Sequence, residues 1–201
     1  MKLLLFSDLH RDRAAARSLL RKADDADVLI GAGDFATTRR GLRDVIEILR
    51  VVSRPSILVA GNSESPDELI QATADWETAT VLHGQGCVVD DVPFWGLGGA
   101  VPVTPFGDWS YDLIESEAAA LLKDCPRHAV LVTHSPPKGI VDRSSAGASL
   151  GSTAVREAID VCAPRLVVCG HIHASAGEIA QVGSTTIVNA GPAGILWDLN
   201  D

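Results

Sequence analysis

The chain has 201 residues and a formal net charge of −9, and it combines 46% apolar with 21% charged residues. These values are typical of a globular protein that buries a core without disulfide or metal cross-links, and we expect one domain over residues 1–201. Proteins that grip a nucleic-acid backbone usually carry a basic balance, so the acidic charge argues against extended nucleic-acid binding.

Cysteine spacing and hydropathy indicate the compartment. The four cysteines lie far apart without a C-x-x-C pair, which excludes zinc-ribbon and thioredoxin-type motifs and favours reduced thiols. The apolar stretch after Met1 and Lys2 is too short for a signal peptide. No apolar run approaches the roughly 20 residues that a membrane span needs. We therefore expect a cytoplasmic protein without membrane association, while no pattern indicates its oligomeric state.

Short apolar runs alternate with helical segments along most of the chain. Buried strands are predicted at residues 3–6, 28–30, 57–60, 129–132 and 166–169. Helices are predicted over residues 11–23 and 41–52, and from Pro66, which acidic residues follow in the first turn. This alternation predicts an α/β fold with right-handed crossovers and a largely parallel sheet.

Two regions break this alternation. Residues 80–99 and 177–199 contain strand-like runs joined by turns with glycine, and no helix separates the runs. Val182 and Gly183 lie between two such runs and indicate a hairpin. We expect antiparallel pairing in both regions, and therefore mixed sheets.

Each of the five predicted strands leads into residues that can bind a metal ion. These residues are Asp8, His10, Asp34, Asn62, His134, His171 and His173. In open α/β sheets, ligands bind in the crevice at the carboxyl ends of the strands, so the seven side chains are expected to converge. Two carboxylates and four imidazoles cannot lie close together at low cost unless cations compensate them.

The residue types indicate which metals would bind. Carboxylate and amide oxygens with imidazole nitrogens, and no thiolate, suit Mn, Fe, Zn, Co or Ni better than an all-oxygen Ca or Mg site. Seven ligands exceed the four of a tetrahedral zinc site, and they fit two ions that share a carboxylate. Two such ions, about 3.5–4 Å apart, can clamp a phosphate and activate a bridging hydroxide. We expect two divalent metal ions, with Mn first, and a small-molecule phosphoester substrate.

Each motif alone has an ordinary structural explanation. A Gly-Asp pair is commonly a turn, and a histidine at a strand end is commonly a hydrogen-bonded structural residue. The five motifs together, in this order, favour the metal centre.

The segments Asp8-Leu9-His10, Gly33-Asp34, Gly61-Asn62, Thr133-His134 and Gly170-His171-Ile172-His173 resemble the calcineurin-like metallophosphoesterase superfamily. The resemblance covers nearly the whole chain and is greatest to small single-domain prokaryotic members. It implies a four-layer α/β/β/α sandwich of two mixed sheets, with a dinuclear metal site at the edge where the strands end. By this resemblance, one metal has the ligands Asp8, His10, Asp34 and His173. The other has Asp34, which bridges, with Asn62, His134 and His171. Asn62 is also the expected catalytic residue.

One position departs from the family pattern. Many members carry a histidine directly after Gly-Asn, where this chain has Ser63. That histidine is thought to assist the leaving group, and general acid catalysis typically contributes about 10²–10⁴-fold. We therefore expect hydrolysis of phosphodiesters or activated esters rather than of alkyl monoesters.

Residues outside the motifs have further expected roles. Arg143 follows the segment after His134, and its guanidinium suits a bidentate contact with the substrate phosphate. Glu64 is expected to orient the loop of Asn62, and His83 to be structural. Residues 100–112 combine proline, glycine and three aromatic residues, and we expect them to border the active site. The alternative for this loop is packing against the core or a subunit interface.

Two other functions compete with a phosphoesterase. A binding or scaffold protein can keep this fold after losing the chemistry, but such relatives usually lose ligands, and all seven positions here carry competent residues. A nuclease would normally need a basic groove or extra domains, and the sequence contains neither.

Overall fold

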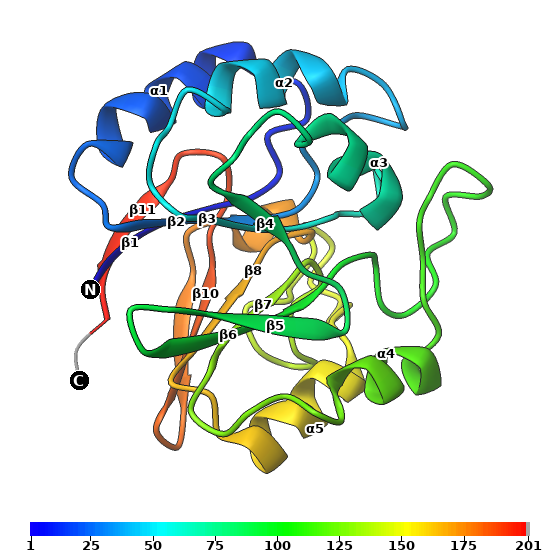
Figure 1. Cartoon of the computed structure of the whole chain (residues 1–201). Coiled ribbons are helices and arrows are strands. Elements are labelled where there is room, and N and C mark those ends of the chain that lie inside the picture. The colour runs from blue at the N-terminus through cyan, green and yellow to red at the C-terminus, as the bar shows by residue number, and fades with distance from the viewer. Residues whose placement is uncertain (200–201) are drawn as a thin grey trace.

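The computed structural model describes residues 1–199 and contains two β-sheets (Figure 1). The first sheet has the strand order β11-β1-β2-β3-β4, with β1 Lys2–Phe6, β2 Val28–Ala32, β3 Ser56–Val59, β4 Ala79–Val81 and β11 Ile195–Asp198. The second has the order β5-β6-β7-β8-β10-β9, with β5 Gln85–Val89, β6 Val92–Leu97, β7 Val130–Thr133, β8 Leu166–Cys169, β9 Ile179–Val182 and β10 Thr185–Asn189.

Helices cover the outer face of each sheet (Figure 1). The helices α1 Arg13–Ala23, α2 Leu42–Leu49 and α3 Pro66–Ala72 lie over the first sheet, and α4 Glu115–Leu122 and α5 Thr153–Cys162 lie over the second. Three clusters of buried apolar residues fill the space between the four layers, and the middle cluster joins the two sheets. The predicted α/β/β/α sandwich of two mixed sheets is confirmed.

Local sequence signals explain where the first helices begin. Asp12 caps α1 by accepting hydrogen bonds from the backbone N–H groups of Ala14 and Ala15, so the helix begins two residues after the predicted start. The helix α3 begins at Pro66, as predicted, behind a capping box formed by Ser65 and Glu68.

The strands pair in both directions, as expected for mixed sheets. The strands β5 and β6 are antiparallel, as are β9 and β10, whose Val182 lies opposite Thr185, so the predicted hairpin is confirmed. However, β4 is parallel to β3, β6 to β7, and β10 to β8. The antiparallel pairing expected in residues 80–99 and 177–199 therefore holds for β5 with β6 and for β9 with β10. Strand β4 does not pair with β5, because the chain passes from the first sheet to the second between them.

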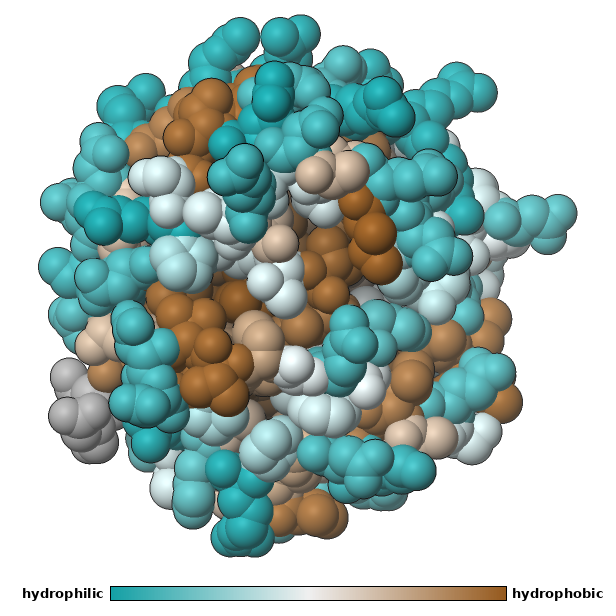
Figure 2. Space-filling view, viewed as in Figure 1, coloured by the Kyte–Doolittle hydropathy of each residue, from teal (hydrophilic) through white to brown (hydrophobic). Residues whose placement is uncertain are grey.

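The parallel strands place their carboxyl ends at a common edge, where the predicted metal ligands follow them. On the face shown in Figure 2, hydrophilic side chains surround smaller apolar areas, as on most folded proteins. Within residues 1–199, no helix combines the length and apolar character needed to span a bilayer.

Candidate metal centre

Four of the candidate ligands have a left-handed backbone conformation. Asp8, His10, Asp34 and His171 have φ values of 55, 43, 56 and 65°. Non-glycine residues rarely adopt this left-handed region, which costs of order 1–3 kcal/mol for each residue and is concentrated at functional sites. The surrounding fold therefore holds these four residues in place against their local preference.

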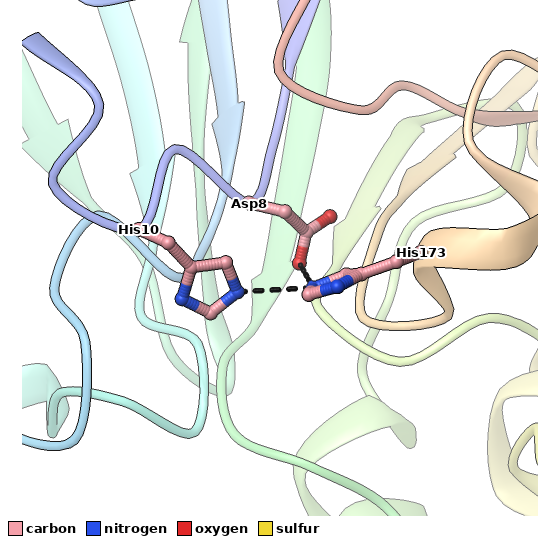
Figure 3. A group of neighbouring side chains, drawn as sticks. All are labelled: Asp8, His10 and His173. Atoms are coloured by element: carbon pink, nitrogen blue, oxygen red, sulfur yellow. Dashed lines mark hydrogen bonds and ion pairs between the residues drawn. The ribbon is translucent and has the colours of Figure 1, made fainter.

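One group of side chains comes from the loop after β1 and from the 3₁₀ turn His173–Ser175 (Figure 3). His10 Nε2 lies 3.0 Å from His173 Nε2, and His173 Nε2 lies 3.5 Å from Asp8 Oδ1. The other ring nitrogen of His10, Nδ1, is 3.1 Å from the carbonyl oxygen of Ala36, to which it can only donate. If neutral, His10 therefore presents a lone pair at Nε2 to the group.

A second group lies deeper, at the ends of β2, β3 and β7. His134 Nδ1 is 2.8 Å from the carbonyl oxygen of Ala32, so the neutral ring donates there and presents a lone pair at Nε2. That nitrogen lies 3.2 Å from Asn62 Oδ1 and 3.5 Å from Asp34 Oδ1. With neutral His134, three acceptors face one another at these distances, and they repel unless a proton on Nε2 or a metal cation lies among them.

Asp34 and Asp8 connect the two groups. Asp34 Oδ2 is 3.3 Å from His10 Nε2, while its Oδ1 faces His134. Ligand atoms of Asp8, Asp34 and His134 lie within 4.8 Å of one another, as do those of Asp8, His10 and His173. These donor sets fit two cations that share a carboxylate.

His171 lies beside the second group. Its ring is 4.9 Å from that of His134, measured between centroids, and its backbone N–H points at Asp8, 3.0 Å from Oδ1. All seven predicted ligands therefore lie in one cluster at the edge of the sheets.

Burial and neighbouring charges shift the pKa values of three candidate ligands. Burial opposes ionisation of Asp8, but its hydrogen bond with His173 and the charge of His134 outweigh burial and lower its pKa to about 2. Burial disfavours the charged form of His134, yet Asp34 and Asp8 raise its pKa overall. Burial and the charge of His134 lower the pKa of His171 to about 3. His171 thus remains neutral, which is the form that binds metals.

Glu64 orients the loop of Asn62, as predicted. Its carboxylate is 1% exposed and accepts hydrogen bonds from the backbone N–H groups of Gly61, Phe35 and Ala36 at 2.8, 3.3 and 2.9 Å. Burial, followed by the charge of Asp34, raises its pKa to about 7. Glu64 joins the loops after β2 and β3, which carry Asp34 and Asn62.

Three residues outside the five metal-binding motifs position the ligands. Ser7 donates to Asp8 Oδ2 at 2.6 Å, and Ser110 accepts from Asn62 Nδ2 at 2.9 Å. Asn189 donates from Nδ2 to the carbonyl oxygens of residues 170 and 172, on either side of His171. For Asn189 its position gave a signal, because it ends β10 just as the ligands follow other strands.

Two other candidates have local partners. The guanidinium of Arg143 is exposed and donates to the carbonyl oxygen of Gly147 in its own loop, so its contact with a phosphate remains a prediction. His83 Nδ1 accepts from the backbone N–H of Gly98 at 3.2 Å, and its Nε2 lies 3.4 Å from Tyr111 Oη. These contacts agree with the structural role predicted for His83.

A sandwich of two mixed sheets, with Asp, Asn and His side chains gathered where the strands end, is the architecture of metallophosphoesterase-fold proteins. The chain belongs to the calcineurin-like phosphoesterase superfamily, whose domain matches residues 1–200. No curated protein sequence matches the chain.

Solved structures support the fold. The chain is similar to the protein TT1561 of Thermus thermophilus, with a TM-score of 0.76, 20% identity, and coverage of 96% of this chain and 90% of that one. It is also similar to the phosphopantetheinyl hydrolase of Mycobacterium tuberculosis, with a TM-score of 0.60, 16% identity, and coverage of 94% and 88%. A dimetal phosphatase from Danio rerio gives a TM-score of 0.57, 12% identity, and coverage of 96% and 88%.

Proposed function

We propose that this chain hydrolyses phosphoesters of small molecules with the help of two divalent metal ions, of which Mn is the first candidate. The observation that carries the proposal is a set of facing acceptor atoms. His134 Nε2 lies 3.2 Å from Asn62 Oδ1 and 3.5 Å from Asp34 Oδ1. When His134 is neutral, such an arrangement is costly in an empty site and favourable around a metal cation.

The residues divide between two metal positions that share Asp34. Asp8, His10, Asp34 and His173 would hold one ion, and Asp34, Asn62, His134 and His171 the other. When bound, the two ions would supply Lewis-acid stabilisation of the phosphate and an activated water. The protein's own contribution is orientation. Backbone carbonyls of Ala36 and Ala32 fix the rings of His10 and His134 so that both present Nε2 to the centre.

The absence of an acid at position 63 supports a preference for activated esters or diesters. Ser63 is 2% exposed, and its backbone N–H donates to Asp34 Oδ1 at 2.8 Å. A serine hydroxyl does not donate a proton to a leaving group at neutral pH as an imidazolium does. Esters with poor leaving groups should therefore react slowly, and Ser63→His should accelerate them by up to about 10²–10⁴-fold if the imidazole acts as a general acid.

The experiment is hydrolysis of bis(p-nitrophenyl) phosphate and p-nitrophenyl phosphate by metal-stripped protein, before and after addition of Mn, Ni, Zn or Mg. We expect metal-restored turnover that disappears in Asp34→Ala and persists in the matched control Asp160→Ala, at an exposed aspartate of α5. Metal content is measured alongside. Stoichiometric metal without turnover of either ester would contradict the proposal and favour a metal-binding or scaffold protein.

A further inference from the structure

The loop between β6 and α4 begins at the metal-binding edge. The strand β6 is parallel to β7, so residues that follow β6 emerge beside Thr133 and His134. The backbone N–H of Gly99 donates to the carbonyl oxygen of Ala60, and that of Tyr111 donates to the carbonyl oxygen of Asn62 at 2.9 Å. Both ends of the loop are therefore hydrogen-bonded to the segment that carries Asn62.

The outer part of this loop projects from the body of the molecule beside α3 (Figure 1). The loop carries Phe106 and Trp109, whose rings are stacked with centroids 5.5 Å apart and planes inclined by 10°. Phe106 is 50% exposed, and the nearby Val103 is 56% exposed. An exposed aromatic ring gains free energy when a partner covers it, and a parallel pair of rings presents a flat apolar face to such a partner.

The aromatic pair lies close to the candidate metal centre along the chain. Trp109 directly precedes Ser110, whose Oγ is 2.9 Å from Asn62 Nδ2, and Asn62 Oδ1 is 3.2 Å from His134 Nε2. Adjacent Cα atoms are about 3.8 Å apart. The Trp109 backbone is therefore one residue away from Ser110, which contacts the candidate ligand Asn62 directly. The loop therefore touches the centre at Ser110, directly beside Trp109 in the chain.

We propose that Phe106 and Trp109 form a stacking platform for a planar aromatic group, a nucleobase or an aryl group, on the part of the phosphoester that is not the leaving group. The proposal rests on the proposed phosphoesterase function and names its substrate class. Stacking suits this role because every base or aryl ring has a π-face, whatever its hydrogen-bonding edge. The acidic balance of the chain favours a small substrate of this kind over an extended polynucleotide.

The test compares three diesters that share one leaving group, p-nitrophenolate. Their other substituent is methyl, a second p-nitrophenyl, or the 5′-oxygen of thymidine. We expect a lower KM for one or both aromatic diesters than for methyl p-nitrophenyl phosphate. In Phe106→Ala and Trp109→Ala that KM should rise roughly 5- to 150-fold, the range for losing one stacked base. Trp109→Phe should retain most of the effect. Val161→Ala, at a 65% exposed side chain of α5, is the control.

The methyl ester separates stacking from damage to the centre. Its kcat and KM, and the metal content, should be the same in the wild type and the platform variants. If the two alanine variants raise KM only for the thymidine diester, the platform binds a nucleobase. If they raise KM only for the bis-aryl ester, the platform binds an aryl group. Equal KM values for all three esters, or an aromatic preference that survives in both alanine variants, would overturn the platform.

A failure of the proposed function gives a different result, since none of the three esters would then be hydrolysed. In that case calorimetry with metal-loaded protein still tests the platform. Thymidine 5′-phosphate should bind more tightly than inorganic phosphate, and Trp109→Ala should remove the difference. Equal affinities would overturn the platform independently of catalysis.

Discussion

The side-chain amide of Asn62 donates a hydrogen bond from Nδ2 to Ser110 Oγ at 2.9 Å, and this contact sets which atom Asn62 turns toward His134. Asp112 accepts the proton of the Ser110 hydroxyl, so Ser110 can only accept from Asn62. The amide oxygen therefore faces the candidate metal position. Asp112 also accepts from the backbone N–H and the hydroxyl of Thr104.

Ser110→Ala should weaken metal binding without removing a ligand. The Asn62 amide would lose the partner that orients it, and loss of such supporting contacts typically costs about 10–100-fold in metal affinity or activity. The measurement is titration of metal-stripped protein with Mn²⁺, in which the weaker of two binding events should shift. Ser145→Ala, at an exposed serine, is the control. Unchanged binding in Ser110→Ala would show that Asn62 needs no such support.

The sequence predicted the layers and the metal-binding edge because both depend on local patterns. Buried strands such as 28–30 have an unmistakable apolar run, and a residue that follows a strand, such as Asp34, must lie at that strand's carboxyl end. Their convergence then follows from parallel pairing, which alternating helices and strands impose.

The positioning contacts were not predictable because they join distant parts of the chain. Ser110 is 48 residues from Asn62, and Asn189 is 17 residues from Ile172, whose carbonyl it binds. Nothing in the sequence near Ser110 distinguishes it from an ordinary loop serine. The parallel pairing of β4 with β3 was missed for a similar reason, because a three-residue strand gives no sign of which sheet it joins.

Gly61→Ala should displace Asp34 and so weaken metal binding. An added Cβ at Gly61 would collide with the carboxylate Oδ1 and the backbone nitrogen of Asp34, and backbone atoms cannot easily move away. Metal content after dialysis should fall well below that of the wild type. The control is Gly139→Ala, where φ is +80° but no atom lies within 4 Å of the added Cβ. Because alanine at a left-handed φ costs about 1–2 kcal/mol, Gly139→Ala should lower stability by that amount and leave metal binding intact. Equal metal content in both variants would contradict this account.

His83 should make the protein less stable as the pH falls below neutrality. Burial lowers the pKa of His83 from 6.5, and the charge of Asp67 offsets this only in part. The unfolded chain therefore binds more protons below pH 6.5. The stability that the lowered pKa of His83 contributes is therefore fully present above pH 6.5. It is lost as the pH falls toward the pKa of His83 in the folded protein. Urea unfolding of metal-stripped protein at several pH values should show a smaller decline in His83→Gln. An identical decline in both proteins would exclude this origin.

Glu64→Ala should lower the free energy of unfolding markedly. Three buried backbone N–H groups, of Gly61, Phe35 and Ala36, would lose their acceptor. Each unsatisfied group costs about 1–3 kcal/mol, so a loss of roughly 3 kcal/mol or more is expected. For a chain of this size each kcal/mol lowers Tm by about 2–4 °C.

Two further variants separate charge from hydrogen bonding at this position. Glu64→Gln keeps one acceptor oxygen and removes the carboxylate charge that faces Asp34, so it should lose less stability than Glu64→Ala in thermal unfolding of the metal-stripped protein. Glu157→Ala, at an exposed glutamate of α5, should leave Tm unchanged within about 1–2 °C, as for most surface substitutions. If Glu64→Ala melted at the wild-type temperature, the three N–H groups would have to find water or other acceptors. Glu64 would then affect the centre through its charge and not by holding the loops of Asp34 and Asn62 together.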